Sequence, residues 1–539
     1  MKRPMVLAMA AVAGLAAVAA GVKNDTPELR AKVEALKDGE TLKLERRDYH
    51  FFQEGAKDVH LAIPGSSWGV KRVTVPIIGK KNVTIDGNGA KIYVHGHAFP
   101  FLAQNCEGVT VKNLSLQCHE LPVKELEVVA KDEKGFTLQL HPEGPKHQVV
   151  DGQLLFTLQD GSIKIPEGEA LKTRIISLHA LKHFQIHYVL NGDNVPKKTK
   201  DALASSYMSA TAEDVGGNRI RYTYLKDEHQ KLLKSCPFAL NDPICIGFAG
   251  REICQMFFSD CRDVKVSDVR VFNGAGMGII AWMCHNLDIS RYRVEPPKGS
   301  LVSLTADSMY VVDCSGEVNI ADSVSCWGLD DPLNVHGDYR KVVACNGAEC
   351  TLGIVIGGQV GVWPYRVGET VEFSTGHGGS RKTLGFAKIA AFEKPADTAE
   401  VAKVVFDKPI PAEWKGMRVA NYSHRPKVTL RGNYFHDGFN TRLSAFGDYL
   451  LEDNVWERTE NSTYADDLTD YYGECGPIHD FTARNNIVLH PRGWGWGFAF
   501  LVKPTGRVSF EGNRYVGVGC ARPYLEVTPE QAKNEREIR

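Results

Sequence analysis

A short strand pattern recurs along this chain at a step that suits one coil of a solenoid. Each copy resembles VTIDGNGAKI, VTLRGNYF or VSFEGN, in which apolar and polar residues alternate and a turn follows. Within each block of copies, neighbouring starts lie 22 to 31 residues apart. Segments that repeat at this step bury one face on the next coil, so stacked coils are predicted rather than several independent domains. The strands start at Val83, Val109, Val264, Leu287, Val318, Val428, Leu450, Phe481 and Val508.

The repeat favours an all-β fold, namely a right-handed parallel β-helix. The strands are short and alternate with a period of two residues. Leucine-rich repeats have a similar length, but their L-x-x-L-x-L-x-x-N pattern does not occur in this sequence. Four cysteines each precede a repeat strand by three or four residues, and they are predicted to form an interior ladder of packed thiols, about 4.8 Å per rung. They are Cys106, Cys261, Cys284 and Cys314.

Two stretches break the period, and both contain alternating strands joined by tight turns. They are predicted to be inserted antiparallel β-barrel-like subdomains. Insertions in solenoids fall on loops and often wall a binding face. The predicted units are a signal peptide at 1–20, N-terminal coils at 21–121, a first insert at 122–240, central coils at 241–338, a second insert at 339–425, and C-terminal coils with a tail at 426–539.

The N-terminal residues have the composition of an export signal. Lys2 and Arg3 precede an apolar run of small residues that ends near an Ala17-Val18-Ala19 cleavage site. The protein is therefore expected to be exported, to the periplasm or the medium, and no later segment is apolar enough for membrane insertion. Lys and Arg total 64 against 65 Asp and Glu, so the net charge gives no reason to expect nucleic acid binding.

Three aspartates are spaced by one coil. Asp307 lies in LTADSM and the pair Asp330-Asp331 lies in GLDDPLNVHG, 23 residues later. They are predicted to lie on neighbouring rungs of one face, with Trp282 one coil earlier. Adjacent residues of a regular strand point to opposite faces, so both members of the pair face one cleft only if a bend intervenes, and Pro332 is compatible with one.

Clustered carboxyl groups on such a face are typical of glycosidic bond cleavage. That reaction needs one protonated acid and one ionised carboxylate, and nearby like charges raise the pKa of one member. An Asp-Asp pair alone is commonly a solvated turn, so the spacing to Asp307 carries the hypothesis. The predicted substrate-binding residues are Trp282 as a ring for the sugar face, Asn334, His336 and Arg442. His336 would bind a sugar hydroxyl or tune Asp330.

The motifs ADS at 306–308 and DDPLNVHG at 330–337, with GMGIIAWM at 276–283, resemble glycoside hydrolase family 110. The resemblance extends over most of the chain after residue 20. It implies a parallel β-helix with barrel-like additions and an exo-acting, inverting α-1,3-galactosidase of the kind that cleaves blood group B antigen. It also implies that no metal or other cofactor is needed, and that the essential aspartates are Asp307, Asp330 and Asp331.

A more distant similarity is to polygalacturonases, which place one Asp about a coil before an Asp-Asp pair. The Arg-Ile-Lys motif of those enzymes is absent here, which argues against a uronate substrate. By this analogy Asp330 is expected to be the general acid, while Asp331 and Asp307 hold and deprotonate the water. An exchange of roles between Asp330 and Asp331 stays open.

Two other functions fit a β-helix with clustered acids. A polysaccharide lyase would need a Ca²⁺ cage and a basic residue in the cleft, so sensitivity to EDTA and an unsaturated product would indicate it. A non-catalytic carbohydrate-binding protein would keep its glycan affinity after Asp330→Asn. The expected partner in the leading hypothesis is a galactose-terminated oligosaccharide or glycoprotein glycan, and a homo-oligomer stays open.

Overall fold

A computed structural model describes most of the residues of the chain. These are 22–66, 68–119, 123–140, 147–150, 153–156, 184–187, 206–208, 210–224, 243–247, 253–297, 302–376, 381–396, 398–459, 463–465, 472–490, 500–502, 505–516, 532–533 and 536–538. The predicted signal peptide at 1–20 lies outside them. No helix among these residues is long and apolar enough to cross a membrane.

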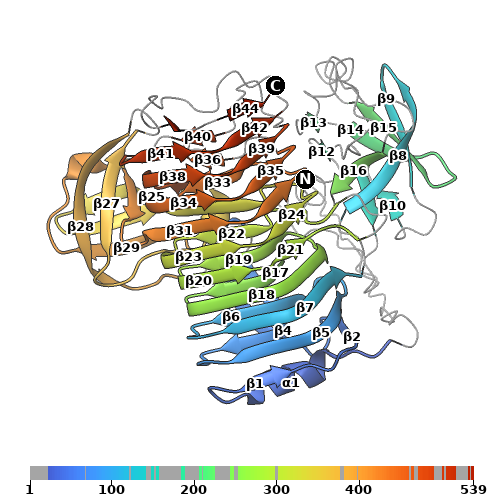
Figure 1. Cartoon of the computed structure of the whole chain (residues 1–539), viewed down its shortest axis with the longest axis horizontal. Helices are drawn as coiled ribbons and strands as arrows, with labels where there is room; N and C mark the ends of the chain where they lie inside the picture. Colours follow the sequence, from blue (N-terminus) through green and yellow to red (C-terminus); the bar gives the residue numbers. More distant parts are fainter. Residues whose placement is uncertain are drawn as a thin grey trace, which may run out of the picture.

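The chain stacks its coils into a parallel β-helix, as the repeat predicts (Figure 1). A short helix, α1 (Thr26–Ala35), lies beside the first coils. Two parallel sheets run the length of the stack. The first contains β1 (Thr41–Lys43), β2 (Asp48–Phe51), β5 (Thr84–Val94), β7 (Thr110–Cys118), β18 (Arg262–Asn273), β20 (His285–Ser290), β21 (Arg293–Val294), β23 (Ser315–Ala321), β24 (Val324–Cys326), β31 (Pro426–Arg431), β32 (Tyr434–His436), β34 (Gly447–Glu452), β35 (Val455–Glu457), β38 (Ile478–Arg484), β39 (Ile487–Leu489), β41 (Val508–Glu511), β42 (Arg514–Val516), β43 (Ala532–Lys533) and β44 (Arg536–Ile538).

The second sheet carries the candidate site. Its parallel strands are β4 (Trp68–Ile78), β6 (Phe99–Gln104), β17 (Cys254–Ser259), β19 (Met277–Trp282), β22 (Met309–Val312), β25 (Leu333–Asn346), β33 (Thr441–Ser444), β36 (Thr463–Ala465) and β40 (Phe500–Val502). Two antiparallel strands join it, β3 (Lys57–Ala62) on β4 and β37 (Glu474–Cys475) on β25.

The register of the first sheet follows the sequence repeat. Val264 pairs with Leu287, Leu287 with Val318, and Val318 with Val428. The next coil pairs through Tyr449, one residue before the predicted start at Leu450. In the run YLLE, Tyr449 and Leu451 are buried while Leu450 is half-buried, because two adjacent leucines make the phase of the alternation ambiguous.

The apolar core lies inside the coils, and the predicted cysteine ladder is part of it. Cys106, Cys261, Cys284 and Cys314 are all buried with free thiols. Each Sγ donates a hydrogen bond to a carbonyl of the preceding coil; the acceptors are Ile77, Ala103, Phe258 and Ala281, at 3.2 to 3.5 Å. The thiols therefore fill small interior positions and satisfy carbonyl groups at the same time.

A second ladder, of buried asparagines, runs through the C-terminal coils. It consists of Asn433, Asn454, Asn486 and Asn513, each at most 1% exposed. The Oδ1 atom of Asn454 accepts the Asn433 amide at 3.0 Å, and its Nδ2 donates to the Leu430 carbonyl at 2.9 Å. The residue before each asparagine is left-handed, with φ between 56° and 66°. The ladder thus supplies partners for main-chain groups that the sharp turn removes from the sheet.

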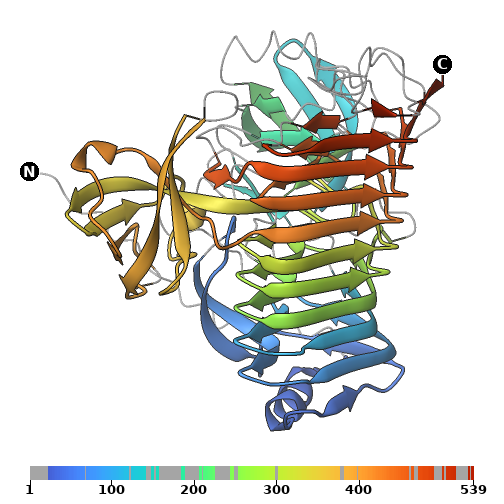
Figure 2. The ribbon, with the colours of Figure 1, turned by 60° about the vertical axis from the view of Figure 1, so that its left-hand side comes forward.

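The second insert closes into a six-stranded antiparallel barrel that projects from one side of the stack (Figure 2). The order around it is β25, β26 (Glu349–Gly353), β29 (Val401–Phe406), β28 (Lys382–Phe392), β27 (Thr370–Thr375), β30 (Arg418–Asn421) and back to β25. A disulfide joins Cys345 and Cys350 at the β25–β26 turn. One strand, β25, therefore belongs to both the β-helix and the barrel.

The first insert is an antiparallel sheet of seven described strands beside the later coils (Figure 1). Its order is β13 (Ser206–Met208), β12 (Phe184–His187), β16 (Pro243–Gly247), β8 (Val123–Asp132), β9 (Gly135–Gln139), β15 (Arg219–Tyr224) and β14 (Ala210–Asp214), with a separate hairpin of β10 (His147–Val150) and β11 (Gln153–Phe156). The predicted fold class, a parallel β-helix with two inserted antiparallel β-barrel-like subdomains, is confirmed for the β-helix and for the closed barrel of the second insert, while the described strands of the first insert form an open antiparallel sheet. The unit boundaries read from the sequence stay predictions.

Candidate active site

The three aspartates lie together at the start of two neighbouring strands of the second sheet. Asp307 precedes β22 and the Asp330-Asp331 pair precedes β25. The main chain places them on adjacent coils, because the Ser308 amide donates to the Asp331 carbonyl at 3.0 Å. One carboxyl oxygen from each of the three lies within 4.8 Å of the others. Asp307 and Asp331 are buried, and Asp330 is half-buried.

Both members of the aspartate pair reach this place because the chain bends before β25. Trp327 has a left-handed φ of 57°, and residues 327–332 lie outside any strand. The Asp331 amide donates to Oδ1 of Asp330 at 3.1 Å, which is a local turn contact. Strict strand alternation therefore does not apply, and the two side chains can share one face.

Asp331 is the member of the cluster whose electrostatics are best defined. Its Oδ1 accepts the Asn440 amide at 2.9 Å, and its Oδ2 lies 3.9 Å from Nε of Arg442. Burial raises the pKa of Asp331, Arg442 lowers it and the charge of Asp307 raises it again, to about 8. Interacting carboxyls titrate as a group, so the cluster as a whole keeps a proton near neutral pH.

This pKa predicts a pH-dependent stability effect. An aspartate with a folded pKa near 8 and an unfolded value near 4 binds more protons in the folded state, so its stability contribution falls as the pH rises from about 4 to 8. We expect Asp331→Asn to raise the free energy of unfolding by about 5 kcal/mol at pH 8 and by almost nothing at pH 4. Denaturant titrations across this range measure it.

The matched control for this effect is Asp288→Asn, which makes the same chemical change at an exposed position of β20. Its effect on stability should not vary with pH in the same way. A constant difference between wild type and Asp331→Asn from pH 4 to pH 8 would show that Asp331 is ionised throughout.

The predicted substrate-binding residues lie on two columns of outward-facing side chains. Tyr310, Asn334 and Arg442 pair across β22, β25 and β33, and Arg442 is the one that reaches Asp331. Trp282 and His336 lie in the other column, with Val312 between them. The structure therefore brings Asn334 and Arg442 to one column and Trp282 and His336 to the next.

Three of these residues carry buried polar atoms that could meet sugar hydroxyls. Among the described residues, no hydrogen-bond partner is found for Oδ1 of Asn334, Nε2 of His336 or Nε1 of Trp282. Trp282 is only 4% exposed and packs in an apolar cluster, with Nζ of Lys394 5.9 Å from its ring centre. Its role as a stacking platform stays a prediction.

Glu474, on β37, is a site residue that the sequence analysis missed. Its side chain is buried, its Oε2 accepts Nη1 of Arg442 at 3.0 Å, and its Oε1 accepts Nδ2 of Asn334 at 3.4 Å. The same Oε1 lies 3.9 Å from Nε2 of His336. An isolated Glu in YYGECGP carries no repeat or motif, so no signal in the sequence marks it.

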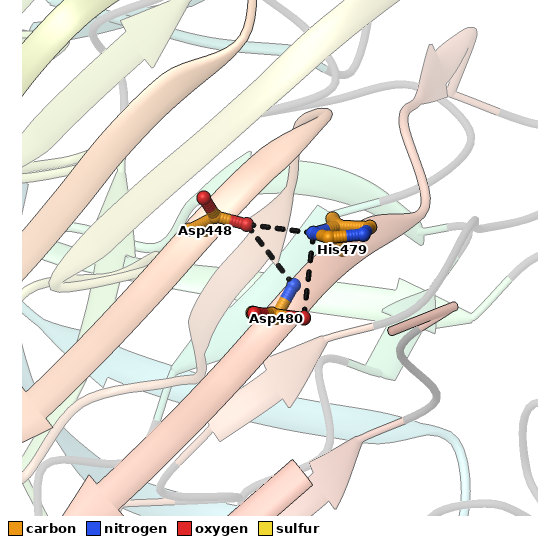
Figure 3. Close-up of side chains that lie close together, drawn as sticks. All are labelled: Asp448, His479 and Asp480. Carbon is orange, nitrogen blue, oxygen red and sulfur yellow. Dashed lines mark hydrogen bonds and ion pairs between the residues drawn. The ribbon is translucent and has the colours of Figure 1, made fainter. Parts of the chain in front are cut away.

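Ligand-type side chains also gather at an exposed place on the first sheet (Figure 3). Nδ1 of His479 lies 2.9 Å from Asp448 and 3.3 Å from Asp480, and these residues come from β34 and β38. Asp480 is also held by Arg507, through its main-chain amide and its guanidinium. Each of the three side chains therefore has a hydrogen-bond or ion-pair partner within the chain.

The strand topology and the carboxyl cluster define a parallel β-helix protein with an acidic site on its outer face. The curated proteins similar to it include α-1,3-galactosidase B of Bacteroides thetaiotaomicron, 24% identical over 87% of this chain and 73% of that protein. They also include α-1,3-galactosidase A of the same organism, 23% identical over 76% and 68%. A third, α-1,3-galactosidase B of Akkermansia muciniphila, is 23% identical over 87% of this chain and 56% of its own length.

These homologues cover most of the chain and are consistent with assignment to glycoside hydrolase family 110, so the resemblance seen in the motifs is confirmed. No family model matches the chain. Similar solved structures include a polygalacturonase from Erwinia carotovora, with a TM-score of 0.37 and 8% identity over 96% of this chain and 91% of that one. Another is an exopolygalacturonase from Yersinia enterocolitica, with a TM-score of 0.33 and 11% identity over 96% and 76%.

Proposed function

We propose that the protein is an exported, exo-acting, inverting α-galactosidase that releases terminal α-1,3-linked galactose from glycans such as blood group B antigen. The observation that carries the proposal is the grouping of Asp307, Asp330 and Asp331 on one face. Their motifs are those that resemble the family, and the curated homologues are named α-1,3-galactosidases. The substrate is therefore a galactose-terminated oligosaccharide or glycoprotein glycan.

In this proposal Asp330 donates its proton to the glycosidic oxygen, and the bond from that oxygen to the galactose C1 breaks. A water molecule attacks C1 from the opposite side and gives its proton to Asp331 or Asp307. Asp330 is the most exposed of the three carboxyls, which suits contact with the leaving sugar. The pKa of Asp331 is raised to about 8, and because the three carboxyls titrate together, the proposal places this shared proton on Asp330 when the glycosidic oxygen is bound.

The stereochemistry of the released galactose tests the inverting mechanism most directly, because the separation of the two catalytic carboxyl groups differs between inverting and retaining enzymes. Most inverting enzymes separate their two carboxyl groups by about 6.5 to 9.5 Å. Here the nearest oxygens lie closer together, so the proposal places the attacking water beside Asp307 and Asp331 rather than between two opposed carboxyls.

We expect proton NMR of a reaction on a blood group B oligosaccharide to show β-galactose before mutarotation. Appearance of α-galactose first would contradict inversion and the roles given to the aspartates. If neither this substrate nor a linear α-1,3-galactoside releases galactose, the galactosidase proposal is wrong. Export is tested separately, by N-terminal sequencing of the protein recovered outside the cytoplasm, which should begin near residue 20.

A further inference from the structure

Glu474 reaches the site from a part of the chain far from the other site residues in sequence. Its strand, β37, runs antiparallel to β25, with Asp338 opposite Glu474 and Gly337 opposite Cys475. The Tyr339 amide donates to the Gly473 carbonyl at 3.0 Å, and Nε2 of Gln359 donates to the same carbonyl at 3.1 Å. The main chain on either side of Glu474 is therefore fixed to the shared strand and to the barrel.

Glu474 is the common partner of three residues that the sequence analysis assigned to the substrate. It accepts hydrogen bonds from Asn334 and Arg442, and it lies 3.9 Å from His336. Its side chain is only 8% exposed. A carboxylate buried to this extent is stable when cations and hydrogen-bond donors surround it, which is the case here.

Arg442 is shared unequally between Glu474 and the catalytic cluster. Its Nη1 is 3.0 Å from Glu474, while its Nε is 3.9 Å from Asp331. Its guanidinium also lies over the ring of the exposed Tyr472, 5.3 Å from the ring centre. The ion pair of Arg442 with Glu474 is therefore shorter than its ion pair with Asp331.

Among the described residues, several charged groups lie near Asp331. Asp307 and Asp330 are the other carboxyls of the cluster, and Arg442 is the cation. Glu474 forms an ion pair with Arg442 and lies near His336. A guanidinium drawn fully onto Asp331 would stabilise its ionised form and remove the proton from the cluster.

We propose that Glu474 is a positioning residue that holds Arg442 back from Asp331, so that the acid cluster keeps the proton required for glycosidic cleavage. This inference rests on the proposed function. Glu474 touches neither the water nor the glycosidic oxygen in this scheme, and it acts through Arg442. The negative charge of Glu474 also favours the protonated form of Asp331 directly, because it raises the pKa of that residue.

The test is Glu474→Gln, which keeps the shape of the side chain and an acceptor for Arg442 but removes the charge. We expect the alkaline limb of the pH profile of kcat/KM to move down by about one pH unit. The value of kcat/KM at the optimal pH should fall less than tenfold, because the three aspartates of the cluster are unchanged. Glu474→Asp, which restores the charge, should return the limb toward its original position.

The matched control is Glu452→Gln, which removes a carboxylate held by Arg431 and Arg484 on the outer surface of the first sheet. Its pH profile should coincide with that of the wild type. An unchanged alkaline limb in Glu474→Gln, or the same shift in the control, would overturn the proposal.

A second readout does not depend on turnover. The fall in wild-type stability between about pH 4 and 8 should be smaller and end at a lower pH in Glu474→Gln, since the folded cluster then loses its proton earlier while the unfolded aspartates titrate as before. If the wild type has no galactosidase activity, the proposed function fails, while this measurement still decides the role of Glu474. An identical pH dependence of unfolding in both proteins would show that Glu474 does not act on the cluster.

Discussion

Replacement of Asp330 by Asn should reduce kcat about a thousandfold on a galactoside whose leaving group is a sugar. A sugar alkoxide leaves poorly without a proton, and the amide that replaces the carboxyl would have none to give. On an aryl α-galactoside with an acidic phenol as leaving group, the loss should be far smaller. Comparison of kcat on the two substrates therefore measures general acid catalysis directly.

Asp331→Asn is the matched variant, because it makes the same change one residue away in the same cluster. It should lose activity on both substrates to a similar extent, since it impairs the activation of water and not departure of the leaving group. If Asp331→Asn shows the leaving-group contrast and Asp330→Asn does not, the two aspartates exchange roles. If neither variant loses activity, the cluster is not catalytic.

Replacement of Asn454 by Ala should lower the free energy of unfolding by about 3 kcal/mol or more. The substitution removes the acceptor of the Asn433 amide and the donor to the Leu430 carbonyl, and it leaves both main-chain groups buried. The Asn486 side chain also loses a partner, at 3.0 Å. Denaturant unfolding followed by circular dichroism provides the measurement.

The neighbouring residue offers a control for the asparagine ladder. Asp453 is exposed and left-handed, with φ of 57°, and Gly432 and Gly512 hold the corresponding place in other coils. Asp453→Gly should leave stability nearly unchanged, because glycine adopts this conformation readily. Equal losses from Asn454→Ala and Asp453→Gly would mean that the turn, and not the ladder, carries the stabilisation.

The sequence predicts the β-helix well because its information is local and repeated. The pairing of Val264, Leu287, Val318 and Val428 needs only the alternation within each strand and the step between them. The closeness of Asp307 to the aspartate pair could be expected for the same reason, since one coil separates them. The bend that lets Asp330 and Asp331 share a face depends on the left-handed Trp327, for which the sequence gives no signal.

Glu474 could not be predicted, because its place depends on an antiparallel pairing across the end of a coil. The spacing of the repeat gives the order of coils but not which loop folds back onto them. The buried state of Trp282 has a similar cause: an aromatic at an outward position is expected to be exposed, and here it is packed in an apolar cluster that includes Val362 of the second insert.

The strand β25 connects the acid pair directly to the barrel. It starts two residues after Asp331, pairs within the β-helix through His336, and continues without interruption into the barrel as far as Asn346. At the same junction His424 lies 3.0 Å from Glu369 and 3.9 Å from Asp313, so charges join the two bodies as well. The barrel and the turn that carries the acid pair are therefore joined by one continuous strand. A displacement of the barrel would act on the backbone next to Asp331 without any change in the side chains of the site.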